Sequence, residues 1–279
     1  MNKTWLVTGT HTGFGKQLAI KLAQQKNVNL VATSRKPGQL DYLDQYDHGQ
    51  IIKVILDVTN HSQVIDAVNS AMDHFKQIDV LVNNAGIGYF GTFEESAIDE
   101  AKYMFDVNVW GLVDMTRQVL PIMRKQKSGA IVNFSSIGGL YSFPTLSFYH
   151  GTKYAVEGIT DSIRKEVEGL GIKTMLVEPS GFRTDWAGRS SHKTLPTHED
   201  YEQFVEFINQ NATGAHHEPG DPQKAAEIII DQVVNNFDNL PMHLPLGKTS
   251  SNLAIKKYEE LLKEFKDLRK ISLSADQPE

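Results

Sequence analysis

Cysteine is absent from the 279-residue chain. Its absence excludes disulfides, a thiol nucleophile and every zinc or iron–sulfur site that uses Cys ligands. Long basic runs are also missing and the formal net charge is −6, whereas a nucleic-acid-binding protein usually carries a basic stripe. We therefore expect no nucleic-acid partner.

Long hydrophobic runs are missing as well, so we expect no membrane-spanning segment. The chain enters a strand-like run at Lys3 and shows no signal-peptide core, which favours a cytoplasmic protein. Its 40% hydrophobic and 22% charged residues are ordinary for a soluble globular protein. Residues 1–279 are expected to form a single domain.

Short β-rich runs alternate with longer helical patterns along the chain. Most of these runs are continuously apolar, which is typical of strands buried on both faces. The alternation predicts an α/β fold: a doubly wound Rossmann-type parallel sheet of about seven strands with helices on both faces. The seven predicted strands are Lys3–Thr8, Val28–Thr33, Ile51–Asp57, Asp79–Asn83, Ala130–Ser135, Ile172–Glu178 and Met242–Leu246.

Three helical patterns stand out between and after these strands. The first begins near Phe14, the second runs from about Ser147 to Leu170, and the third is a C-terminal helix over residues 248–270. The tail from Ser272 onward is expected to be frayed.

One long stretch, residues 185–221, is predicted to be irregular because it is rich in Ser, His, Thr and Gly. Since it follows a strand, it is a candidate substrate loop or lid, with a passive insertion as the alternative. His216 and His217 within it have no clear third ligand. We therefore expect no metal site.

A glycine-rich turn, T-G-T-H-T-G-F-G from Thr8 to Gly15, follows the first strand and opens the first helix. Glycines allow a tight turn there, and the helix N-terminus offers N–H groups to phosphates. The spacing is G-x-x-x-G-x-G rather than G-x-G-x-x-G, and a strand–helix turn without any ligand is the alternative.

Tyr149 and Lys153 are four residues apart and share one face of the second helix. A Tyr side chain has an ordinary pKa of about 10 and is a poor base near neutrality. A nearby Lys cation, together with an oxidised nicotinamide, would lower that pKa and suit Tyr149 to acid/base catalysis. Core packing of an aromatic residue is the alternative.

These motifs, together with N-N-A-G at Asn83–Gly86, occur in an order that resembles the short-chain dehydrogenase/reductase family over about residues 3–184. The resemblance is to its single-domain branch. It implies an NAD(P)-dependent oxidoreductase that moves a hydride between nicotinamide and a carbonyl or alcohol. It also implies a set of catalytic residues, which are Asn108, Ser136, Tyr149 and Lys153.

The resemblance assigns a role to each member of that set. The Ser136 hydroxyl would hold and polarise the substrate oxygen; Ser135 is the alternative, but the spacing to Tyr149 favours Ser136. Asn108 would bend its helix and anchor a water that relays protons to Lys153, unless it is a solvent-facing residue. Lys153 would also hydrogen-bond the nicotinamide ribose.

The second strand ends in Ser34, Arg35 and Lys36, without the acid that NAD-preferring proteins place against the ribose 2′-OH. Arg binds phosphate through a bidentate fork, so the sequence predicts NADP(H) over NAD(H). Two solvated loop cations are the alternative. The resemblance implies that Asp57 meets the adenine; a helix N-cap is the alternative, and one residue can do both.

Residues 179–184 resemble the P-G-x-x-x-T segment that borders the nicotinamide in this family, with Ser180 in place of Gly. The neighbouring Gly181 is expected to supply the backbone freedom. The full set of predicted cofactor-binding residues is Gly9, His11, Thr12, Gly13, Phe14, Gly15, Ser34, Arg35, Asp57, Val58, Asn84, Ala85, Gly86, Tyr149, Lys153, Pro179, Phe182 and Thr184.

Aromatic residues near the predicted strand ends, Tyr89, Phe90, Phe182 and Trp186, favour a bulky apolar small-molecule substrate, unless they only pack loops on the core. The resemblance implies a homodimer or homotetramer. Two other functions stay open: an NADP(H)-binding redox sensor without catalysis and, less favoured, a sugar-nucleotide epimerase or dehydratase.

Overall fold

The computed structural model of the chain describes residues 2–188, 190–213 and 217–277. At its centre is a sheet of seven parallel strands in the order β3-β2-β1-β4-β6-β7-β9. The predicted doubly wound α/β fold is confirmed. The strands are β1 (Lys3–Val7), β2 (Val28–Ser34), β3 (Ile51–Ile55), β4 (Val80–Asn83), β6 (Gly129–Phe134), β7 (Ile172–Pro179) and β9 (His243–Leu246).

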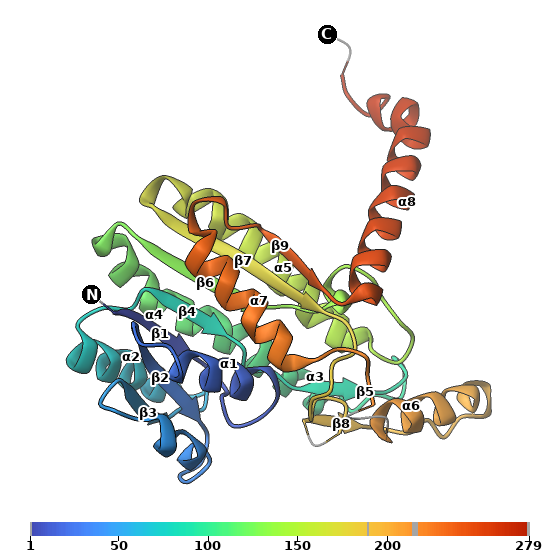
Figure 1. Ribbon diagram of the computed structural model, residues 1–279. Helices are drawn as coiled ribbons and strands as arrows, with labels where there is room; N and C mark the ends of the chain where they lie inside the picture. Colours follow the sequence, from blue (N-terminus) through green and yellow to red (C-terminus); the bar gives the residue numbers. More distant parts are fainter. Residues whose placement is uncertain (1, 189, 214–216, 278–279) are drawn as a thin grey trace.

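Helices cover both faces of this sheet (Figure 1). In β1, Trp5 and Val7 belong to one hydrophobic core and Leu6 to the other, which is why the run is continuously apolar. The first core lies beneath α1 (Gly13–Ala23) and α7 (Pro222–Asn235). The second core lies beneath helices on the opposite face, which are α2 (His61–Phe75), α4 (Gly111–Gln126) and the C-terminal half of α5 (Ser147–Val167).

The strand order reverses at β1, which pairs with β2 on one side and with β4 on the other. In open α/β sheets, ligands bind in the crevice outside the carboxyl ends of the strands at such a switch point. The glycine-rich turn that follows β1 and the Asn84 segment that follows β4 both lie there. The topology therefore brings two of the predicted motifs together.

The segment 185–221 is not irregular, contrary to the sequence-based expectation. It contains α6 (Gln203–Thr213) and the three-residue strand β8 (Ser191–Lys193), which pairs with β5 (Gly88–Phe90). The sequence did not reveal these elements because strands of three residues are too short to show an alternation of apolar and polar residues. The few apolar residues of α6 are hidden in a mostly polar stretch. His216, which the sequence does not support as a metal ligand, lies outside the described residues.

The C-terminal helix α8 (Lys248–Leu273) is three residues longer than predicted and projects away from the sheet (Figure 1). Only Ser250 and Ala254 of α8 are buried. Within the described part of the chain, no helix combines the length and the apolar composition that a membrane crossing needs. The remaining helical segments are η1 (Asp41–Tyr46), α3 (Ile98–Phe105), η2 (Asp106–Trp110), η3 (Ile137–Gly139), η4 (Glu168–Leu170), η5 (Glu199–Tyr201) and η6 (Phe237–Asn239).

Candidate active site

A cavity of about 910 Å³ lies at the carboxyl ends of β1, β4, β6 and β7. Every predicted site residue lines it except Gly15 and Asn108. Because β2 and β3 form one side of the sheet and β6 and β7 the other, Ser34 and Asp57 lie toward one end of the cavity and Ser136 toward the other. The cavity is therefore extended along the sheet edge, as a dinucleotide site must be.

The glycine-rich turn is shaped for close approach by a phosphate. Gly9 and Gly13 have φ values of 70° and 55°, which residues with a side chain rarely adopt. A Cβ atom on Gly15 would collide with the carbonyl group of Gly9, so Gly15 is needed although it does not line the cavity. Thr12, at the N-cap of α1, makes no side-chain bond to the first turn, so its side chain does not compete for those N–H groups.

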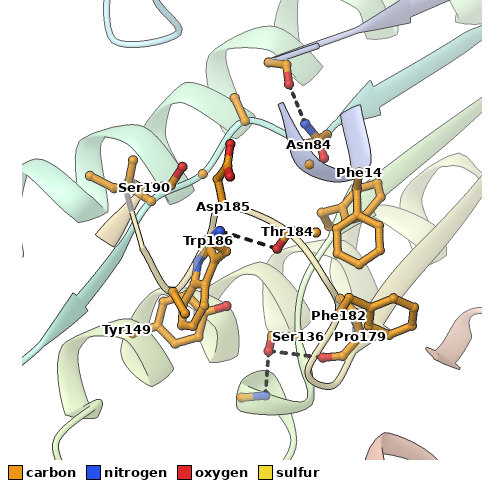
Figure 2. Close-up of a pocket in the computed structure, with 18 of the residues that line it drawn as sticks. Phe14, Asn84, Ser136, Tyr149, Pro179, Phe182, Thr184, Asp185, Trp186 and Ser190 are labelled. Carbon is orange, nitrogen blue, oxygen red and sulfur yellow. Dashed lines mark hydrogen bonds between the residues drawn. The ribbon is translucent and has the colours of Figure 1, made fainter. Parts of the chain in front are cut away.

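The Asn84 segment braces this turn from the neighbouring strand (Figure 2). The Thr8 hydroxyl accepts hydrogen bonds from the backbone N–H groups of Asn84 and Ala85, both at 3.0 Å. The Asn84 amide in turn donates to the carbonyl oxygens of Thr8 at 2.9 Å and Gly9 at 3.0 Å. Four hydrogen bonds thus lock the turn after β1 to the end of β4.

At the β2 and β3 end of the cavity, the structure separates the two interpretations of Asp57. Its carboxylate accepts hydrogen bonds from the backbone N–H and the hydroxyl of Thr59, whereas the N-cap of α2 is Asn60. The helix-cap interpretation of Asp57 is therefore wrong. Ser34 is buried, and Arg35 lines the cavity and is exposed.

The predicted catalytic side chains Ser136, Tyr149 and Lys153 line the other part of the cavity and are all buried. Lys153 Nζ donates to the carbonyl oxygen of Phe134 at 2.8 Å and lies 5.8 Å from the centroid of the Tyr149 ring. Burial lowers the pKa of Lys153 to about 8, against the opposing charge of Glu157.

The protein's own groups raise the pKa of Tyr149, whereas the predicted lowering includes an oxidised nicotinamide beside it and stays a prediction. Burial raises this pKa to about 12, although a hydrogen bond with Ser136 lowers it in part. The Trp186 ring lies against the Tyr149 ring with their centroids 4.8 Å apart, which contributes to this burial (Figure 2). Removing water from the phenolate outweighs the Ser136 hydrogen bond, so Tyr149 carries its proton at neutral pH.

Asn108 lies behind the cavity in the π-helical turn η2, between α3 and α4. Its side chain accepts from the backbone N–H of Ile87 at 2.8 Å and donates to the Ile87 carbonyl at 2.9 Å and to the Thr152 hydroxyl at 3.1 Å. The residue is 2% exposed, so a solvent-facing role is excluded. π-Helical turns inside longer helices are frequent at functional sites.

The segment after β7 holds the last predicted cofactor residues. The Phe182 ring packs on Phe14 with centroids 5.0 Å apart, and Thr184 is buried beside Gly13. Ser180, which replaces the family glycine, donates from its backbone N–H at 3.1 Å and from its hydroxyl at 3.3 Å to the carbonyl oxygen of Leu246. The hydroxyl of Ser180 therefore adds a second bond between this loop and β9, which a glycine could not make.

Aromatic and polar side chains from the 185–221 segment also line the cavity. Trp186, which the sequence suggested, lies 5.7 Å from Phe90 between ring centroids. Phe207 and Asn211 of α6 also line the cavity. No motif marks these two residues, since only the tertiary fold brings α6 to the site.

Comparison with known proteins gives consistent matches. The sequence profile of a family described as short chain dehydrogenase matches residues 3–195. The chain is 35% identical over 277 residues to the oxidoreductase BOA17 of Botryotinia fuckeliana, covering 99% of this chain and 100% of that protein.

Solved structures of other proteins share the fold, and two of them illustrate the similarity. A short-chain dehydrogenase from Streptomyces avermitilis superposes with a TM-score of 0.90 and 32% identity, covering 99% of this chain and all of that one. ElxO with NADP bound superposes with a TM-score of 0.70 and 29% identity, covering 88% of this chain and 96% of that one.

Proposed function

The chain belongs to the short-chain dehydrogenase family and is an oxidoreductase, and we propose that it moves a hydride between NADP(H) and the carbonyl or alcohol group of an apolar substrate. Tyr149 is the general acid/base of this proposal. One observation carries it: the glycine-rich turn and the trio of Ser136, Tyr149 and Lys153 line the same cavity.

The residues of the cavity fit a dinucleotide. The turn from Gly9 to Gly13 and the N-terminus of α1 offer backbone N–H groups to a pyrophosphate. Arg35 offers a guanidinium to a 2′-phosphate, and no acid at the end of β2 opposes it. The NADP bound to the structurally similar ElxO supports this preference. The cofactor supplies or accepts the hydride when bound.

Side chains of the protein supply and remove the proton of the substrate oxygen in this proposal. Tyr149 is protonated at neutral pH, so its hydroxyl can donate to a carbonyl oxygen as that oxygen gains charge. Ser136 holds the same oxygen through its O–H group. Lys153, when charged, stabilises the phenolate that remains on Tyr149. In the reverse direction, the phenolate removes the proton from an alcohol.

The walls around Tyr149 support an apolar substrate. Phe90, Phe143, Leu146 and Trp186 line the cavity there, and pockets of this composition bind apolar ligands with a few polar groups for orientation. The proposal also includes a cytoplasmic single-domain protein that assembles as a homodimer or homotetramer, as the family resemblance implies.

The test is consumption of NADPH and, in parallel, of NADH with a panel of apolar aldehydes and ketones against short polar ones. The proposal predicts faster turnover with NADPH and with the apolar carbonyls. If NADPH binds tightly but no carbonyl on the panel is reduced and no alcohol is oxidised, the protein is instead a redox sensor. A preference for NADH would overturn the role given to Arg35.

A further inference from the structure

His150 follows Tyr149 in helix α5 and is 4% exposed. Backbone groups lie within hydrogen-bond distance of both nitrogens of its ring. The Phe143 backbone N–H donates to Nε2 at 2.8 Å, and Nδ1 lies 2.8 Å from the carbonyl oxygen of Gly138. A backbone N–H can only donate, so Nε2 accepts. Nδ1 therefore carries the hydrogen and donates to Gly138, and the ring is neutral.

The two bonded groups belong to one loop. Gly138 and Phe143 lie five residues apart in the segment that follows Ser136, and both line the cavity. A Cβ atom at Gly138 would lie 2.8 Å from His150 Nδ1, so the glycine permits this close contact. One imidazole thus holds two points of the loop that forms a wall beside Tyr149.

The bond to Gly138 also reaches the proposed catalytic hydroxyl. The Gly138 N–H donates to Ser136 Oγ at 3.0 Å, while its carbonyl accepts from His150 (Figure 2 shows the first of these bonds). A hydroxyl has one hydrogen to donate and two lone pairs. The Gly138 N–H occupies one lone pair, and the Ser136 hydroxyl donates its hydrogen to the carbonyl oxygen of Pro179 at 3.5 Å. The incoming bond from Gly138 holds the Ser136 oxygen in place and polarises its O–H group.

We propose that His150 is a positioning residue with two separable arms: its Nδ1 arm sets the orientation of the Ser136 hydroxyl through Gly138, and its Nε2 arm fixes Phe143 as a wall of the substrate pocket. This inference rests on the proposed function for the identity of the reaction. The low pKa that burial imposes on His150 is in keeping with a neutral ring.

Two amide substitutions separate the arms. The side-chain nitrogen of Asn can take the place of Nδ1, so His150→Asn keeps the Gly138 bond and loses the Phe143 bond. The side-chain oxygen of Gln reaches the place of Nε2, so His150→Gln keeps the Phe143 bond and loses the Gly138 bond. His150→Leu loses both. Thr160→Val is the matched control, because Thr160 is a buried residue of α5 that accepts from Asn133 Nδ2 at 2.9 Å, away from the cavity.

Steady-state kinetics with NADPH and a carbonyl substrate should divide the variants. His150→Asn should raise KM for the carbonyl about tenfold with kcat nearly unchanged, the size expected for one lost hydrogen bond. His150→Gln should lower kcat about tenfold with KM nearly unchanged. Equal changes in both constants for both variants, or changes no larger than those of Thr160→Val, would overturn the inference.

Amide hydrogen exchange gives a readout that needs no turnover. The Phe143 amide donates to Nε2, so it should lose protection in His150→Asn and His150→Leu and keep it in His150→Gln. The Gly138 amide donates to Ser136 Oγ, so it reports the Nδ1 bond through the orientation of the Gly138 peptide: it should keep its protection in His150→Asn and lose part of it in His150→Gln, in which the Gly138 carbonyl is no longer held. Unchanged protection at both amides in all three variants would contradict the positioning role of His150. If the variants show this exchange pattern but the wild-type protein reduces no carbonyl, the proposed function is contradicted and the positioning role of His150 stands.

Discussion

Replacing Glu157 by Gln is predicted to stabilise the protein at alkaline pH and not at acid pH. Glu157 lies one helical turn after Lys153, beside the fully buried Glu178, and 3.7 Å from His243 Nδ1. His243 makes its closer bond, 2.6 Å, to Glu178. The Glu157 carboxyl group is therefore largely buried, and the nearby His243 makes its closer contact with Glu178.

Burial raises the pKa of Glu157 from its ordinary value of 4.5 to about 7. The nearby Ser135 hydroxyl and the charges of His243 and Lys153 oppose this rise, and the charge of Glu178 adds to it. A carboxyl whose folded pKa exceeds its unfolded pKa binds more protons when folded, so stability falls as pH rises between the two values. At about 1.4 kcal/mol per pH unit, the full cost of ionising Glu157 is about 3 kcal/mol.

Chemical denaturation at pH 5 and at pH 8 measures this cost. The Gln side chain stays neutral, so Glu157→Gln should raise the free energy of unfolding by up to about 3 kcal/mol at pH 8 and should change it little at pH 5. Glu166→Gln on the exposed face of α5 is the control and should show no such pH dependence. A Glu157→Gln effect of the same size at both pH values, or a loss of stability at pH 8, would refute the reasoning.

Three further outcomes are expected at the site. Arg35→Ser should raise KM for NADPH about 10- to 100-fold through the lost phosphate bond, and an equal rise for NADH would contradict that role. Gly15→Ala should abolish NADPH binding in a fluorescence titration, because its methyl group collides with the Gly9 carbonyl; unaltered affinity would contradict this geometry. Asn108→Ala should lower the free energy of unfolding by about 2 to 4 kcal/mol, because it leaves buried backbone groups of Ile87 unpaired, and a change below about 0.5 kcal/mol would show that those groups find other partners.

The seven-stranded sheet could be predicted because most of its strands are buried on both faces and therefore consist of consecutive apolar residues. The motifs could be placed together because the carboxyl ends of parallel strands meet at one edge of the sheet. By contrast, β5 and β8 have three residues each, and their pairing joins segments about a hundred residues apart. Neither strand has a local pattern that would reveal it.

The catalytic helix shows a second limit of sequence reasoning. The spacing of Tyr149 and Lys153 predicts a shared helix face, and both line the cavity, but the spacing says nothing of Trp186, which covers the Tyr149 ring. Whether burial or a neighbouring cation controls a pKa depends on such distant contacts. The roles of His150 are likewise visible only once Gly138 and Phe143 are seen against its ring.

The most direct test of the central claim is the turnover number of Tyr149→Phe for carbonyl reduction, measured with NADPH at saturation and compared with that of Tyr154→Phe. Tyr154 is a partly exposed tyrosine on the same helix and serves as the control. We predict that Tyr149→Phe still binds NADPH but loses turnover by at least about a hundredfold, the usual contribution of a general acid, while Tyr154→Phe keeps wild-type turnover. Equal turnover in wild type and Tyr149→Phe would contradict the role of Tyr149 as the proton donor.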